Sequence, residues 1–261
     1  MTIYKHEWKQ NQKSLWIWTL SVAVMNIICM MLYPQMRDQA DSVSAMFSQM
    51  GGFSSAFGMN QVNFGEALGF FAIECGNMLA LGGVMFAALL GIGMLAKEEN
   101  LHTAEFLLTH PVSRRSVLAQ KLAAVYTLLV VFYLVNFAGT VISFPCVGEE
   151  IPWKELTMVF AANLFLALEV SSVCFALSAF LKGTSAGLGI GIGMLFYFLN
   201  IFGNISDKAE WVKYVTPFSY ADAPTIIADS ALDAKLICIG AGYLVAGVVI
   251  AFWQYSRKDI A

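Results

Sequence analysis

Long runs of apolar residues, separated by shorter polar connections, follow one another along the whole chain. A helix that crosses about 30 Å of hydrocarbon needs roughly 20 mainly apolar residues. Six runs meet this requirement, and they are 15–33, 69–95, 116–145, 156–181, 184–202 and 236–253. The pattern therefore predicts an all-α membrane protein with six transmembrane helices, in which residues 1–261 form a single domain.

The polar connections differ in length and therefore in their expected structure. Lys182 and Gly183 alone separate the fourth and fifth runs, which predicts a tight turn in which Gly183 supplies an unusual backbone angle. Residues 34–68 contain many Met, Phe and Gly residues and predict a short amphipathic helix against the membrane. Residues 203–235 place Trp, Pro and Phe between polar residues, which is typical of interfacial or re-entrant pieces.

The basic residues of the connections predict how the chain is oriented. With the N-terminus inside, ten Lys and Arg residues lie on the cytoplasmic side and five on the other, as the positive-inside rule requires. The inside set is Lys5, Lys9, Lys13, Lys97, Arg114, Arg115, Lys121, Lys182, Arg257 and Lys258. The outside set is Arg37, Lys154, Lys208, Lys213 and Lys235. We therefore expect a multi-pass protein of the cell (plasma) membrane with cytoplasmic N- and C-termini.

Composition supports the membrane assignment and excludes several other classes. Hydrophobic residues make up 58% of the chain and charged residues 13%, whereas about 25% of the residues of a soluble domain are charged. A net charge of −3 and the absence of a basic run exclude nucleic acid as a partner and leave membrane lipid as one. The five cysteines are scattered without a CxxC pair, which argues against a disulfide framework or a metal site.

The connection between the second and third runs is the most distinctive segment of the chain. It has the sequence KEENLHTAEFLLTHPVSRRSVLAQKL. Acidic residues surround the apolar cluster 106–108, Pro111 ends the helix and Ser113 can cap the next one. A simple turn needs fewer residues, so the segment predicts a short amphipathic helix suited to a groove on another protein. A helix resting on lipid headgroups is the alternative.

The same segment resembles a known family. The pattern E-E-N-x-x-T-A-E-F-L-L-T-x-P-V-S-R, followed by Lys121, resembles the first cytoplasmic loop of ABC-2 type transporter permeases. Within that family it is similar to the branch of short six-span permease subunits such as NatB and NosY. YVTPFSY at 214–220 resembles the segment before the last span, and YSRKDI at 255–260 resembles the family's C-terminal ending. The resemblance covers essentially the whole chain.

The resemblance implies an ABC-2 exporter fold that works as one subunit of a larger assembly. Two permeases pair, as a homodimer or a paralogous heterodimer, and two cytoplasmic ABC ATPase subunits drive them. Residues 1–14 correspond to an amphipathic elbow helix, and residues 97–113 to a coupling helix that sits in a groove of the ATPase. Carried over by motif position, the ATPase-coupling residues are Glu98, Glu99, Thr103, Glu105, Phe106, Leu107, Leu108, Pro111 and Arg114.

The sequence lacks the chemistry for ATP hydrolysis. No G-x-x-x-x-G-K-[ST] loop occurs, and no nucleophile–base arrangement stands out. We therefore expect that the chain is not an enzyme and binds no cofactor itself. ATP and Mg would be bound by the partner ATPase.

Three polar residues inside the spans are candidates for the translocation path. An ionised carboxylate at bilayer depth costs at least about 2.5 kcal/mol, so such groups usually face protein or water. Glu169, together with Asn163, either lines a path between two permease copies or packs helices as a protonated or hydrogen-bonded group. Glu74 lies in the outer part of its span, where packing or contact with the headgroups is the favoured interpretation.

Small residues recur at four-residue spacing in two spans. The three sets are Gly83, Ala87 and Gly91; Gly183, Gly187 and Gly191; and Gly189 and Gly193. Such faces let membrane helices approach closely. Packing within one subunit is the favoured interpretation, and a dimer seam is the alternative.

Together these features predict the permease subunit of an ATP-driven ABC exporter, whose translocation path forms in the dimer. Spans with few buried charges favour a hydrophobic or amphipathic substrate, such as an antimicrobial peptide, a drug or a lipid. One alternative is a standalone secondary transporter or channel that uses Glu169 for proton coupling. Another is a membrane scaffold or sensor whose inner connection docks a signalling protein.

Overall fold

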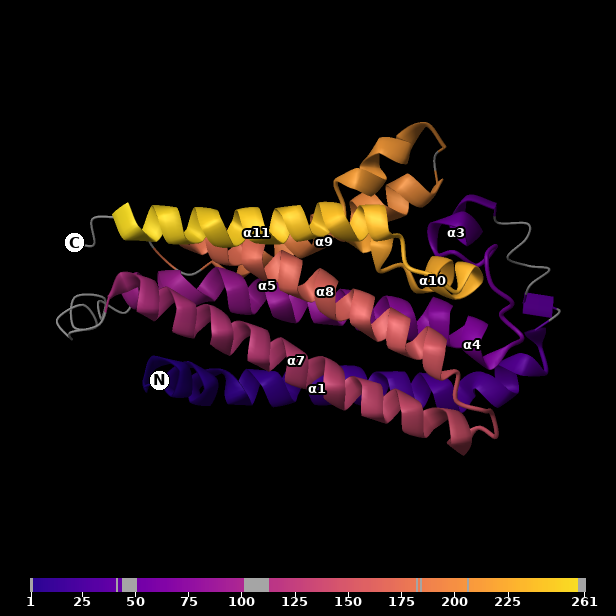
Figure 1. Ribbon diagram of the computed structural model, residues 1–261. Coiled ribbons are helices and arrows are strands. Elements are labelled where there is room, and N and C mark those ends of the chain that lie inside the picture. Colours follow the sequence, from indigo (N-terminus) through magenta and orange to yellow (C-terminus); the bar gives the residue numbers. More distant parts are fainter. Residues whose placement is uncertain are drawn as a thin grey trace.

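The computed structural model describes residues 2–40, 42–43, 51–100, 113–181, 183, 185–205 and 207–257, with the backbone alone at 98–100, 207–208 and 210. In these residues the secondary structure is helical, without a strand. Among the described residues, six helices are long and apolar enough to cross a membrane, which confirms the predicted all-α fold with six spans. Figure 1 shows both ends of the chain on the same side of the bundle, which we name the termini end.

The spans overlap the six apolar runs of the sequence. They are α1 (Thr2–Arg37), the composite α4 (Ala67–Phe70), η1 (Phe71–Gly76) and α5 (Asn77–Asn100), then α7 (Arg114–Cys146), α8 (Trp153–Ser178), α9 (Ala186–Ile205) and α11 (Ala234–Arg257). Ser113 caps α7, because its hydroxyl accepts a hydrogen bond of 3.3 Å from the Ser116 amide. This confirms the cap that the sequence predicts at the start of the third span.

The N-terminal stretch is helical but is not a separate elbow. Residues 2–14 continue without a break into the first span, so that α1 is one helix from Thr2 to Arg37. Neither Gly nor Pro interrupts these residues. Glu7 is buried against neighbouring helices, with 1% of its surface exposed, which keeps the stretch aligned with the bundle. The stretch predicted as an elbow is therefore the first part of the first membrane helix.

The junction between α8 and α9 is longer than the predicted two-residue turn at Lys182 and Gly183. Helix α8 ends at Ser178 and α9 begins at Ala186, so the predicted boundaries 156–181 and 184–202 are both shifted. Ser185 starts α9, because its hydroxyl accepts a 3.4 Å hydrogen bond from the Leu188 amide. This N-cap places the beginning of the helix after the polar residues.

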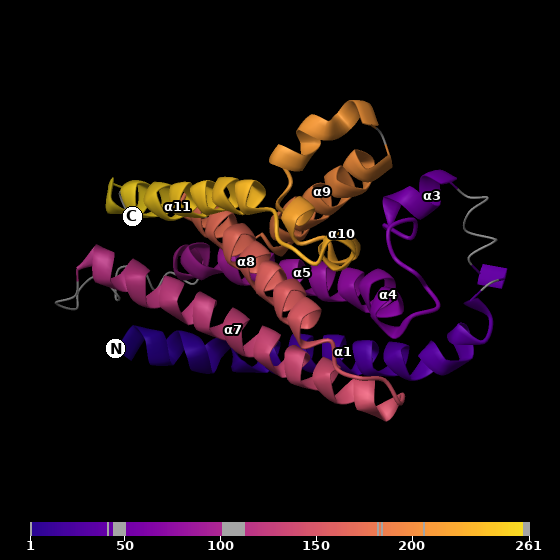
Figure 2. The same cartoon turned by 45° about the vertical axis from the view of Figure 1, so that its right-hand side comes forward.

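At the end opposite the termini, the connections are partly helical. Helix α3 (Gly51–Ala56) lies in the first of them, where the sequence predicts a short amphipathic helix. The connection between α9 and α11 contains η2 (Asp207–Tyr214), η3 (Pro217–Tyr220) and α10 (Ala223–Asp229), which we name the return segment. Figure 2 shows this segment folding back beside α9 and α8.

The return segment is inserted among the spans. Phe218 and Tyr220 are 3% and 4% exposed. The Thr216 hydroxyl donates a hydrogen bond of 2.8 Å to the Phe196 carbonyl oxygen on α9. Of the two structures that the sequence allows for this connection, the buried side chains favour a re-entrant segment.

Helix α5 is the centre of the bundle, and glycines set its distance from two neighbours. A Cβ atom at Gly91 would lie 2.5 Å from the Ser171 carbonyl oxygen on α8. Gly189 and Gly193 of α9 approach α5 in the same way, at Ile92 and Val84. Packing within one subunit therefore explains these glycines.

The other glycine register of α9 has no such role in the chain. A Cβ atom at Gly187 or Gly191 would have no atom within 4 Å. In the most apolar 18-residue stretch of α9, 11% of the residues are buried, whereas the share is 72% in the corresponding stretch of the second span. One face of α9 is therefore packed and the other is open.

We expect Gly91→Ala to destabilise the bundle by about 1–3 kcal/mol, because the added methyl group forces α5 away from the backbone of α8. Gly93→Ala is the matched control, since a Cβ atom there would have nothing within 4 Å. Thermal unfolding of the purified protein in detergent measures both. Equal melting temperatures for the two variants would contradict the tight α5–α8 contact.

Candidate functional site

A buried ionic network joins three helices near the termini end. The Lys121 ammonium donates hydrogen bonds of 2.8 Å to Glu7 Oε1 and 2.9 Å to the Met94 carbonyl oxygen. The Lys97 ammonium donates to the other carboxylate oxygen, Glu7 Oε2. Glu7 and Lys121 have side chains 1% and 0% exposed, so the ion pair between them is shielded from water. We name Glu7, Lys97 and Lys121 the ionic network.

The network lies on both sides of the connection between α5 and α7. Lys97 is in the last turn of α5, before the connection, and Lys121 lies about two turns into α7, after it. Glu7 comes from the N-terminal part of α1. One carboxylate therefore ties both legs of the connection to the first span.

Further contacts join the start of α7 to the two ends of the chain. Arg114 Nη1 donates a hydrogen bond of 3.4 Å to the carbonyl oxygen of Tyr255, a buried residue of α11. The Tyr4 amide donates a 3.5 Å hydrogen bond to Gln120 Oε1. The first turns of α7 are thus held by both α1 and α11.

The sequence-predicted coupling residues fall mostly outside the described part of the chain. Thr103, Glu105, Phe106, Leu107, Leu108 and Pro111 are outside the described residues. Glu98 and Glu99 continue the backbone of α5, and Arg114 is the first residue of α7. The structure therefore shows the two legs that carry the connection, and the predicted docking helix at 97–113 stays a prediction.

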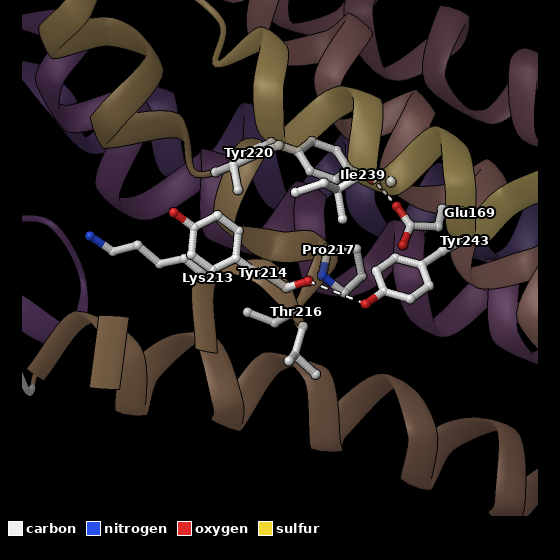
Figure 3. Close-up of a pocket in the computed structure, with 11 residues that line it drawn as sticks. Glu169, Lys213, Tyr214, Thr216, Pro217, Tyr220, Ile239 and Tyr243 are labelled. Atoms are coloured by element: carbon white, nitrogen blue, oxygen red, sulfur yellow. Dashed lines mark hydrogen bonds between the residues drawn. The ribbon is translucent and has the colours of Figure 1, made fainter. Parts of the chain in front are cut away.

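A second polar site surrounds Glu169 in α8. The Tyr220 hydroxyl donates a hydrogen bond of 2.5 Å to Glu169 Oε2, and the carboxylate is 3% exposed. Figure 3 shows Glu169 at one side of a pocket whose other walls come from α11 and the return segment. The pocket is small, because its cavity volume is about 10 Å³, which is no more than a single water molecule needs.

Asn163, which also lies on α8, contacts the return segment too. Its amide nitrogen donates hydrogen bonds of 2.9 Å to the Val159 carbonyl oxygen and 3.4 Å to the Ala221 carbonyl oxygen. The structure thus brings Asn163 and Glu169 together at neighbouring residues of the return segment. Their shared contact is within one chain; a path between two copies stays a prediction.

Glu74 lies elsewhere. It belongs to η1, a π-helical turn inside the second span, and is partly buried. In the described residues no hydrogen bond or ion pair joins it to Asn163 or Glu169. A π-helical turn inserts an extra residue into the helix and often marks a functional position. The three path candidates therefore do not form one cluster.

The Tyr220 hydroxyl acts as a hydrogen-bond donor. Burial raises the pKa of Tyr220 well above its ordinary value, and the negative charge of Glu169 raises it further. The phenol therefore keeps its proton at physiological pH. In the part of the chain that the structure describes, no group of three or more His, Cys, Asp or Glu residues is placed to hold a metal ion.

The sequence does not show which residues pair within the ionic network or which residue binds Glu169. Glu7 is one acid in a lysine-rich N-terminal stretch, and Lys121 belongs to the family-like pattern without a partner in sequence. The available signal is the depth of Lys121 inside an apolar run, since a charge at membrane depth needs a counter-charge. Tyr220 could be found only by its place in the YVTPFSY segment.

One family model matches almost the whole chain, and a bacterial protein matches part of it. A model of the family described as ABC-2 family transporter protein matches residues 1–260, which include the ionic network and the Glu169 pocket. The chain is also similar to a Bacillus subtilis (strain 168) protein described as uncharacterized protein YhcI. The two are 24% identical over 216 residues, covering 73% of this chain and 68% of the relative.

We expect Glu7→Gln to destabilise the protein by about 3–5 kcal/mol, because it removes the buried negative charge that accepts hydrogen bonds from the Lys121 and Lys97 ammonium groups. Glu150→Gln is the control, since Glu150 is exposed. Thermal unfolding in detergent measures the loss. The double variant Glu7→Gln with Lys121→Met also removes the buried ammonium group and should recover part of the stability; a double variant no more stable than Glu7→Gln would contradict the network.

Proposed function

The chain belongs to the ABC-2 family of transporter proteins, and from this membership we propose that it is the permease subunit of an ATP-driven exporter. In this proposal separate cytoplasmic ATPase subunits bind ATP and Mg and supply the energy. The membrane orientation follows the basic residues, so that the termini end faces the cytoplasm of a cell (plasma) membrane.

The observation that carries the proposal is the ionic network around the α5–α7 connection. Lys97 and Lys121 lie on its two legs and share the buried carboxylate of Glu7. Arg114, at the start of the second leg, also contacts α11 through Tyr255. A force on the connection would therefore reach α1, α5, α7 and α11 together.

This arrangement suggests how ATP acts on the spans. Closure of the ATPases around ATP would displace the predicted docking helix at 97–113. Because buried ion pairs resist separation, the legs and the N-terminal part of α1 would move as one body. ATP binding then favours one packing of the spans over another, which is a population shift set by the difference in affinity between the two states.

Two copies of a permease are proposed to complete the path, and α9 offers a face for that contact. Gly187 and Gly191 lie on the open side of this helix, whereas Gly189 and Gly193 pack on α5. Small residues on an open face allow close helix approach in a membrane. The pairing is proposed for two identical or two paralogous permeases, with a hydrophobic or amphipathic substrate such as an antimicrobial peptide, drug or lipid.

Charge reversal at Glu98 and Glu99 tests the coupling. We expect the double variant Glu98→Lys with Glu99→Lys to uncouple ATP hydrolysis from transport, because these acids lie at the end of α5, where the chain enters the predicted docking segment. The chain is co-purified with the ATPase encoded nearby, and both activities are measured in liposomes. Reversal of the exposed Glu150 and Asp229, at the other end of the bundle, is the control. Normal coupling in the Glu98 and Glu99 variant would count against the assignment.

Liposomes containing this chain alone separate the proposal from a standalone transporter. A permease subunit should give no transport without its ATPase. Transport driven by a proton gradient alone would favour the secondary transporter.

We expect Gly191→Phe to lower the fraction of paired permeases in nanodiscs, because a large ring on the open face of α9 prevents close approach. Single-molecule photobleaching of labelled protein counts the copies. Leu134→Phe adds bulk to an exposed position of α7 and is the control. Unchanged pairing in Gly191→Phe would exclude this face of α9 as the contact.

A further inference from the structure

An open pocket lies between the start of α7 and the last turns of α11. Its lining residues are Arg115, Phe252, Trp253, Ser256 and Arg257, and we name it the basic pocket. Its cavity volume is about 460 Å³, within the range of roughly 300–1,000 Å³ that is usual for pockets that hold small ligands. Figure 1 shows these two helix ends at the termini end of the bundle. The basic pocket therefore has room for a molecular headgroup.

The two walls of the basic pocket are joined to each other. Arg114, which precedes Arg115, donates a hydrogen bond of 3.4 Å to the carbonyl oxygen of Tyr255 on α11. Tyr255 is buried and lies directly before Ser256 in the last turns of that helix. The pocket is therefore built between two helices that are held together.

The positive charge of the basic pocket is not compensated by the chain. In the described residues, no acid lies within ion-pair distance of either arginine of the pocket, because the ion pairs there belong to Arg37, Lys97 and Lys121. The guanidinium carbon of Arg257 lies 4.6 Å from the centre of the Trp253 ring. A guanidinium that stacks on a ring keeps the N–H donors at its edge available for an anion. The pocket thus offers two positive charges to a ligand.

Towards the middle of α11, the surface next to the basic pocket is apolar. Val245, Val249 and Trp253 follow one another at four-residue spacing, and each is more than half exposed. Residues at this spacing form an inclined row along a helix, and Arg257 is the next member of the row. From Val245 to Arg257 the helix rises about 18 Å, close to half of the roughly 30 Å of a hydrocarbon core. The row therefore has the order of a phospholipid, with charge, interfacial aromatic ring and aliphatic surface.

We propose that the basic pocket binds the headgroup of an anionic phospholipid of the inner leaflet. Arg115 and Arg257 hold the phosphate, since guanidinium groups bind phosphate through paired hydrogen bonds. The Ser256 hydroxyl donates instead to the Phe252 carbonyl oxygen, at 2.7 Å. Basic pockets between helices on the cytoplasmic side of a membrane are typical sites for anionic headgroups. The inner leaflet follows from the orientation proposed above, whereas the binding itself needs no ATPase.

Two features distinguish an anionic lipid from other phosphate compounds. The apolar row of α11 gives an acyl chain a surface to contact, and a free phosphate has no part that would use it. A zwitterionic headgroup carries its own cation, which would lie beside two arginines at a cost in repulsion.

A headgroup held by arginines of two helices adds a bridge between them. Arg115 lies on α7, which also carries Lys121 of the ionic network, and Arg257 ends α11. The lipid therefore joins the same helix ends as the hydrogen bond from Arg114 to Tyr255. Because a ligand that binds only the folded protein stabilises it, anionic lipid raises the melting temperature.

Lipid binding by the purified full chain tests the site. The chain in non-ionic detergent is titrated with dioleoylphosphatidylglycerol; native mass spectrometry counts bound lipid, and thermal unfolding follows the melting temperature. Dioleoylphosphatidylcholine has the same acyl chains on a zwitterionic headgroup, and glycerol 3-phosphate is the phosphate without acyl chains. We expect the anionic lipid to bind at least about tenfold more tightly than the zwitterionic one and to raise the melting temperature. Equal binding of the two lipids, or an equal rise with glycerol 3-phosphate, would overturn the proposal.

Two double variants separate the basic pocket from general attraction to the basic surface of the termini end. Arg115→Gln with Arg257→Gln removes both charges of the pocket and should abolish the preference for anionic lipid. Lys9→Gln with Lys13→Gln removes two charges from α1 at the same end and should keep it. All four side chains are exposed, so both variants should fold, and their melting temperatures without added lipid check this. An unchanged preference in the arginine variant, or an equal loss in both, would overturn the site.

Discussion

The buried carboxylate of Glu7 is the interaction on which the termini end of the bundle depends. Each of its oxygens accepts a hydrogen bond from a different lysine, and one of the two, Lys121, is fully buried. Breaking such a pair exposes an uncompensated charge to a medium of low dielectric constant. The acid therefore makes one rigid unit of three helix ends, and a rigid unit transmits displacement where a flexible loop would absorb it.

Close packing around α5 determines which helix faces are buried and which stay open. Glycines bring α5 against α8 and α9, so the second span is largely buried while α9 keeps an open face. Because hydrocarbon and apolar side chains are equally nonpolar, membrane helices associate through close van der Waals fit instead of a hydrophobic driving force. Glycines thus pack α9 against α5 on one side of the helix. The glycines on its other side leave a face that can meet lipid or a second copy of the chain.

The return segment supplies the hydrogen-bond partners of two polar residues of α8. Glu169 and Asn163 hold successive residues of this segment, Tyr220 and Ala221, and the glycine at 240 lets α11 close over the pair. Three elements distant in sequence therefore meet at one buried carboxylate. A carboxyl group at that depth needs a polar partner. The return segment provides one through the Tyr220 hydroxyl.

The sequence by itself determined the number, approximate position and helical nature of the spans, because the insertion of an apolar helix in hydrocarbon depends on local composition. It also indicated the Ser113 cap and the distinctive segment after α5, which are local patterns. It did not give the continuity of α1 or the pairing of Glu7 with Lys121, which are 114 residues apart. Nor did it distinguish the packed glycines of α9 from the open ones. Only the tertiary structure decided these features, because contacts between distant residues depend on how the helices pack, and hydropathy along the chain is the same for many packings.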